Sequence, residues 1–130
     1  MRAGSRGSGY LVAAAAYVLG ITALSHVPGQ TLARLGLHLW DKGIHAAEFL
    51  PLGFLLAAFA IRRWGPSAQP ALVVAVVTGL GLVLGGADEL HQWFVPGRTS
   101  SWGDATADMI GSLLGALIAV AIGRRRPRAV

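Results

Sequence analysis

Four apolar runs of 16 to 20 residues constrain the fold of this 130-residue chain more than any other feature. They cover residues 10–25, 44–61, 71–90 and 105–123. A helix needs about 20 apolar residues to cross roughly 30 Å of hydrocarbon. Backbone N–H and C=O groups inside lipid must be satisfied within their own segment, so each run predicts a helix rather than a strand. We therefore expect an all-α polytopic membrane protein, a four-transmembrane-helix up-and-down bundle.

The charged residues are too few for an ordinary soluble domain. Charged residues make up 13% of the chain and apolar residues 54%, whereas about 25% of a soluble domain is charged. The absence of cysteine excludes a disulfide scaffold and any thiolate ligand. The net charge is +5, but most basic residues flank the apolar runs, as they do in membrane proteins. We therefore expect a membrane lipid as a partner and no nucleic acid.

The first apolar run has two interpretations. Arg2 and Arg6 precede a short apolar core that ends in the small residues Ala23 and Ser25, which is also the pattern of a secretory signal. We favour a membrane helix, because the sequence after Ser25 does not resemble a mature soluble protein. The predicted organisation is a flexible leader, a transmembrane domain and a basic tail, over residues 1–9, 10–123 and 124–130.

The basic residues predict the orientation of the helices. Eight of them lie at the amino end, in the second-to-third loop and in the tail. The three on the other side are Arg34, Lys42 and Arg98. The positive-inside rule then places both termini in the cytoplasm, in a multi-pass protein of the cytoplasmic (inner) membrane. Trp40, with two later tryptophans, falls at the outer interface.

All six acidic residues lie at or just inside the helix ends predicted to face outward. They are Asp41, Glu48, Asp88, Glu89, Asp104 and Asp108. An ionised side chain at membrane depth costs about 2.5–3.5 kcal/mol, so such acids usually line a bundle interior or a watery cavity. Because three helices contribute, we expect one polar pocket that opens to the outer face.

The second helix carries the first polar face. Asp41, His45 and Glu48 follow one another at i, i+4 and i+7. Asp41 alone suits a plain interfacial helix start, but His45 and Glu48 on the same face favour a functional site. Pro51 cannot donate to the carbonyl of Ala47, so a kink or a free carbonyl is expected beside Glu48.

The third helix supplies a second polar face. Asp88, His91 and Gln92 share it, with Glu89 at its margin. Arg98 follows the next turn, where it is either an interfacial anchor or a fork for phosphate or carboxylate. The candidate catalytic residues of the whole pocket are Asp41, Lys42, His45, Glu48, Glu89, His91, Gln92, Asp104 and Asp108. The candidate ligand-binding residues are Asp88 and Arg98.

The fourth helix combines acids with small residues. Asp104 and Asp108 share a face with the GxxxG pair Gly111 and Gly115. Such a stripe lets another helix approach closely, so the Gly111/Gly115 face is also a candidate for homo-oligomer formation. Ser101 and Asp104 have the spacing of a capping box, so helix capping and a role in the pocket stay equal alternatives for Asp104.

Three motifs resemble those of the VanZ-like family. In order, they are Asp41-Lys42-Gly43-Ile44-His45 with Phe49, Asp88-Glu89-Leu90-His91-Gln92 with Pro96-Gly97-Arg98, and Asp104-Ala105-Thr106-Ala107-Asp108 with Gly111. The family comprises small integral membrane proteins named for a protein associated with teicoplanin resistance. The resemblance covers residues 41–115 and implies the fold, a membrane location and a link to glycopeptide susceptibility. At position 108 this chain has Asp where many members have Asn.

The charge of the predicted pocket is unbalanced. Six carboxylates face two basic side chains, Lys42 and Arg98, so a simple anionic lipid phosphate would be repelled. Either some acids are protonated, or histidines are charged, or a divalent cation is bound. His45 or His91 with carboxylates could hold zinc, but no motif has a diagnostic metal spacing, so no metal or other cofactor is assigned.

Three functions fit this pocket. The first is binding or modulation of a lipid headgroup or a cell-envelope precursor. The second is a membrane-embedded hydrolase or transferase that acts on a lipid ester or phosphoester by acid–base or metal-assisted chemistry. The third is a proton-coupled carrier, which ranks last because the inner halves of the helices carry few polar side chains. Whether the protein is an enzyme stays open.

Overall fold

A computed structural model describes residues 7–36 and 41–125 of the chain. Its α-helices are α1 (Ser8–Ser25), α2 (Gly29–Arg34), α3 (Asp41–Trp64), α4 (Pro70–Gln92) and α5 (Trp102–Arg125), and a 3-10 turn, η2 (Gly65–Ser67), follows α3. The described residues contain no strand, and the four long helices are apolar enough to cross a membrane. The predicted all-α four-helix membrane fold is therefore confirmed.

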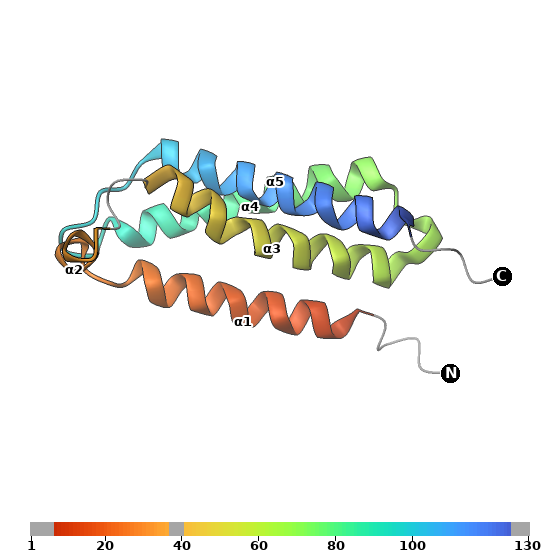
Figure 1. Ribbon diagram of the computed structural model, residues 1–130, viewed down its shortest axis with the longest axis horizontal. Coiled ribbons are helices and arrows are strands. Elements are labelled where there is room, and N and C mark those ends of the chain that lie inside the picture. The colour runs from red at the N-terminus through yellow and green to blue at the C-terminus, as the bar shows by residue number, and fades with distance from the viewer. Residues whose placement is uncertain (1–6, 37–40, 126–130) are drawn as a thin grey trace.

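The long helices alternate in direction, so α1 begins and α5 ends at the same end of the bundle (Figure 1). The short helix α2 lies in the connection after α1, outside the four apolar runs from which helices were predicted. α3 continues as one helix across Pro51. Trp40 and most of the predicted leader and tail lie outside the described residues.

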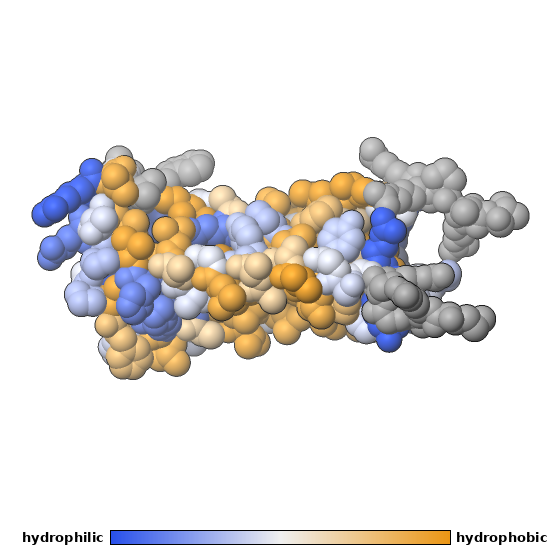
Figure 2. Space-filling model, turned by 90° about the horizontal axis from the view of Figure 1, so that it is seen from below, coloured by the Kyte–Doolittle hydropathy of each residue, from blue (hydrophilic) through white to orange (hydrophobic). Residues whose placement is uncertain are grey.

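The bundle has two chemically different ends. We call the end where α3 and α5 begin the acidic end, and the end that carries Arg62, Arg63 and Arg124 the arginine end. On the face that Figure 2 shows, apolar side chains cover most of the surface between the two ends, and the most hydrophilic ones gather at the ends. This pattern is the one expected of a protein whose middle lies in hydrocarbon.

α5 packs directly on α3 through small residues. A Cβ added at Gly111 would overlap the backbone of Ala46, and one added at Gly115 would overlap Leu50 and Phe54. Gly111 and Gly115 are buried by this contact. The stripe that was predicted to offer a face for self-association is therefore filled by α3 of the same chain, because the glycines let the two backbones approach.

The apolar core occupies the half of the bundle toward the arginine end. Six small or branched side chains from α3, α4 and α5 form it, and they are Ala57, Ala60, Val73, Val77, Ala116 and Ala119. A second cluster joins α1 to α3 through Ala14, Ile21, Phe49 and Leu52. α1 buries few other residues, so it is the least tightly held of the long helices.

Candidate functional site

The carboxylates converge at the acidic end, where α3 and α5 begin and α4 ends. Asp104 and Asp108 are 2% and 0% exposed, and Asp88 and Glu89 are also buried. Asp41 is exposed at the start of α3. Burial of so many ionisable groups is costly in a membrane protein, so each of them is expected to have a hydrogen-bond or charged partner.

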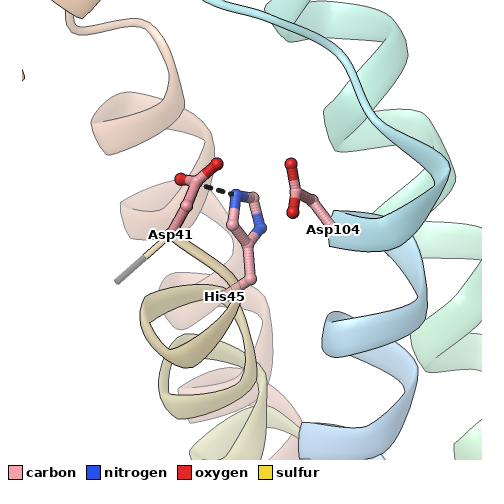
Figure 3. Close-up of side chains that lie close together, drawn as sticks. All are labelled: Asp41, His45 and Asp104. Atoms are coloured by element: carbon pink, nitrogen blue, oxygen red, sulfur yellow. Dashed lines mark ion pairs between the residues drawn. The ribbon is translucent and has the colours of Figure 1, made fainter. Parts of the chain in front are cut away.

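His45 lies at the centre of one group of side chains. Its Nδ1 donates to Oδ1 of Asp108 at 3.0 Å. Its Nε2 lies 3.9 Å from Oδ1 of Asp41 and 3.9 Å from Oε1 of Glu89. Figure 3 shows the imidazole between the carboxylates of Asp41 and Asp104. The ring is thus held on one side by a hydrogen bond and faces carboxylates on the other.

Asp104 is held by Lys42 rather than by the cap of its own helix. Nζ of Lys42 donates to Oδ1 of Asp104 at 2.9 Å. The hydroxyl of Ser101 accepts from the N–H of Gly103 at 3.1 Å, while the N–H of Ser101 donates to Oε2 of Glu89 at 2.5 Å. Ser101 therefore caps α5 as predicted, but Glu89 of α4 occupies the position expected for the Asp104 side chain.

Asp88 belongs to a second group of side chains. Oδ2 of Asp88 accepts from the hydroxyl of Ser25 at 2.8 Å and from Nε2 of Gln92 at 2.6 Å. Oε1 of Gln92 in turn accepts from Nε of Arg98 at 3.0 Å. The hydrogen bonds thus run without a break from α1 through α4 to the loop that follows it.

His91 lies apart from the other candidates. Its ring stacks on that of His26 with centroids 5.2 Å apart, and Nε2 of His91 lies 3.1 Å from Nδ1 of His26. Ser25 and His26 were not among the site residues predicted from the sequence. Their position in the sequence could have identified them, because both are polar residues at the end of the first apolar run, at the level of the acids on the other helices.

Three cavities lie around these two groups. Two of them share Leu32, Asp41 and Arg98: a cavity of about 220 Å³ beside Gln92 and Thr99, and one of about 50 Å³ beside His45, Glu48 and Ser25. The third, of about 250 Å³, is mainly apolar and lies between α1, α3 and α4; its lining includes Ile21, Phe49, Leu52, Leu84, Asp88 and His91. Asp41 and Arg98 are therefore the charged residues that line both of the first two cavities, which we call the polar cavities.

The geometry divides the predicted pocket into parts. Lys42, His45, Glu89, Asp104 and Asp108, with Asp41, form the first group. Asp88, Gln92 and Arg98 form the second, and Glu48 lies between them in the small cavity. Two sets of three side chains, Asp41–His45–Asp104 and His45–Glu89–Asp108, bring ligand atoms within 4.8 Å of one another and could hold a metal ion.

The comparisons with known proteins agree with these motifs. The VanZ/LLP1 family profile matches residues 11–123, which is most of the chain and covers nearly all of the four long helices. Comparison with curated proteins finds no match, and comparison with solved structures finds none either. The match covers the three motifs from which the resemblance was first noted, and their side chains converge at the acidic end. This chain is a member of the VanZ/LLP1 family.

Proposed function

We propose that this membrane protein binds an amphiphile whose phosphate-bearing headgroup enters the polar cavities at the acidic end. The observation that carries the proposal is the position of Arg98, which lines both polar cavities at once. A guanidinium is the side chain best suited to grip phosphate with paired hydrogen bonds. Its Nε is already bonded to Gln92, which orients the fork.

The apolar cavity supports an amphiphile over a free anion. It lies between α1 and the α3–α4 pair, among Ile21, Phe49 and Leu84, and it ends at Asp88. Asp88 is bonded to Ser25, which lines the small polar cavity. Apolar and polar spaces therefore adjoin across one hydrogen bond, which is the arrangement that a chain attached to a headgroup requires.

A lipid-linked cell-envelope precursor has the same chemistry as a phospholipid, a phosphate on a long apolar chain. We place the acidic end on the outer side of the cytoplasmic membrane and both termini in the cytoplasm, because Arg62 and Arg63 lie at the other end. An outer-face site suits envelope precursors. A change in glycopeptide susceptibility is then the expected phenotype of a variant that no longer binds.

The test is the lipid that remains with the purified protein. Wild type and Arg98→Gln would be purified in mild detergent and their bound lipid measured by mass spectrometry. Arg63→Gln is the matched control, because it removes an exposed arginine from the other end of the bundle. We expect Arg98→Gln alone to lose phosphate-bearing lipid. Equal lipid content in all three proteins would refute the proposal.

A hydrolase or transferase is a second candidate, favoured by one observation. Asp108 holds Nδ1 of His45 by a hydrogen bond, and Nε2 lies on the side of Asp41. A histidine that acts as a general base needs one nitrogen held and the other free in this way. Turnover of lipid esters or phosphoesters by wild type and its loss in His45→Gln would support this candidate. Unchanged substrate after incubation with a broad panel would argue against it.

The carrier is the least supported candidate. The apolar cluster of α3, α4 and α5 fills the half of the bundle toward the arginine end, so a proton path would have to cross it. The polar groups that such a relay needs lie at the acidic end.

A further inference from the structure

We propose that His45 and Glu89, with Asp108 behind the histidine and Asp41 in front of it, form a site for one divalent transition-metal ion, with Zn²⁺ as the best match. This inference goes beyond headgroup binding and does not rest on it. It rests on four observations within the cluster: the spacing of the ligand atoms, the carboxylate oxygens that lack a partner, the room made for Asp108, and the balance of charge.

The spacing around Nε2 of His45 suits a shared ion better than direct bonds. Nε2 lies 3.9 Å from Oε1 of Glu89 and 3.9 Å from Oδ1 of Asp41. These distances are too long for hydrogen bonds. An ion that is bound at about 2.0–2.2 Å by nitrogen and oxygen fits between Nε2 of His45 and Oε1 of Glu89. Asp41 belongs to a different set of neighbouring ligand atoms from Glu89, so His45 and Glu89 are the direct ligands of the proposed ion.

The other nitrogen of the ring has the partner that a metal ligand needs. Nδ1 donates to Oδ1 of Asp108, a residue that is 0% exposed. A carboxylate that accepts from the far N–H of a ligating histidine fixes its tautomer and leaves the other nitrogen free to bind metal. Asp108 therefore acts as a positioning residue for His45.

Two buried carboxylate oxygens have no hydrogen-bond partner among the described residues. They are Oε1 of Glu89, which faces His45, and Oδ2 of Asp108. Glu89 is 5% exposed, and its other oxygen is occupied by the N–H of Ser101. Such atoms are rare in folded proteins and call for an explanation such as an unseen water or ion. A bound cation would satisfy Glu89 where it now faces only an imidazole.

The chain makes room for this arrangement from α4. A Cβ added at Gly85 would lie 2.6 Å from Oδ2 and 2.7 Å from Cβ of Asp108. Only glycine at position 85 leaves the Asp108 side chain where it meets His45. The glycine on α4 thus provides the space that the carboxylate of Asp108 on α5 occupies.

The charges that face His45 favour a bound cation. Asp41 comes from its own helix, Glu89 from α4, and Asp104 and Asp108 from α5. Lys42 neutralises one of these carboxylates, because its Nζ forms an ion pair with Oδ1 of Asp104. The carboxylates around the imidazole are therefore left in excess in a mostly buried place, where a divalent ion would balance them.

The donor set selects the class of metal. Ca²⁺ and Mg²⁺ prefer all-oxygen sites, whereas an imidazole with carboxylates suits Zn²⁺ and its neighbours. His45 and Asp41 line the small cavity together with Arg98, so the proposed metal site adjoins that cavity.

The test is metal binding by the full-length protein in detergent, without added lipid. Chelator-stripped wild type would be titrated with Zn²⁺ against a competing chelator, alongside Glu89→Gln, His45→Gln and Asp108→Asn. Asp88→Asn is the matched control, because Asp88 is the next buried acid on the same helix but bonds to Ser25 and Gln92. Circular dichroism would show that each variant is folded.

We expect one Zn²⁺ per wild-type chain. Asp108→Asn should weaken binding by about 10–100-fold, as removal of an orienting carboxylate does elsewhere, and Glu89→Gln and His45→Gln should weaken it further. Asp88→Asn should bind as wild type does. If a variant does not fold, X-ray absorption of the Zn²⁺-loaded wild type decides, and an imidazole among nitrogen and oxygen ligands is expected.

The proposal is overturned if stripped wild type takes up no stoichiometric Zn²⁺, if Glu89→Gln binds as tightly as wild type, or if the absorption spectrum lacks an imidazole. None of these results would bear on headgroup binding, which is measured by bound lipid and the Arg98 variant. The two proposals can therefore fail separately.

Discussion

Replacing Gly115 with alanine should separate α3 from α5. A Cβ at position 115 would overlap the carbonyl oxygen of Leu50, and would lie 2.6 Å from the N of Phe54 and 3.1 Å from the carbonyl carbon of Gly53. Ordinary contacts of a Cβ begin at 3.4 Å. All three neighbours are backbone atoms, which cannot turn aside as a side chain can. The helices must therefore move apart along their closest contact.

The cost follows from overpacking, about 1–3 kcal/mol for an extra group in a close-packed interior. Part of this destabilisation would be offset, because alanine stabilises a helix relative to glycine by up to about 1 kcal/mol. Gly123→Ala is the matched control on the same helix: its Cβ would meet only the side chain of Ile61, at 3.5 Å. The difference between the two variants then isolates the overpacking.

The assay is thermal or denaturant unfolding of the detergent-solubilised protein, followed by circular dichroism. Gly115→Ala should unfold about 1–3 kcal/mol more easily than Gly123→Ala. Equal midpoints for the two variants would mean that α3 and α5 do not pack as closely as described.

Two further predictions concern α1 and the orientation of the bundle. Ser25→Ala should lower the unfolding free energy by about 1.5–3 kcal/mol, the range for a hydrogen bond to a charged group, because Asp88 loses a partner from α1. Thr22→Ala is the control, because the hydroxyl of Thr22 bonds within its own helix. An equal effect of both substitutions would contradict the role of Ser25. Because the chain contains no cysteine, single cysteines can report the orientation: a membrane-impermeant thiol reagent should label Thr99→Cys in intact cells and Ser67→Cys only after permeabilisation, and the reverse pattern would invert the proposed topology.

The fold was accessible from the sequence because the bilayer imposes it. The apolar runs at 71–90 and 105–123 fall within α4 and α5, since a span of fixed thickness sets the length of each helix. The sequence could not predict α2, because six residues between two spans carry no periodic pattern of their own. Nor could it say that α3 would fill the Gly111/Gly115 stripe, since a small-residue face fits a helix of the same chain or of another equally well.

The candidate site was predictable as a location but not as a set of bonds. Helix periodicity correctly placed His45 on the face of Asp41, and the alternation of the helices placed the acids at one end. It could not pair Ser101 with Glu89, because that bond joins the end of the α4–α5 loop to the last turn of α4 and depends on the path of the loop. Ser25 was missed for a similar reason: its partner, Asp88, lies 63 residues further along the chain.

The glycines connect the fold to the site. Gly111 and Gly115 bring α5 against α3, and that approach sets the depth at which Asp108 meets His45, one turn before Gly111. Gly85 on α4 clears the space that the Asp108 side chain fills from the other side. Positions that a helix-propensity scale would count as weaknesses are thus the ones that position the buried carboxylate. In such a bundle the close packing of the helices and the polar cluster at its acidic end depend on the same few residues, so a substitution at any of these glycines would disturb both.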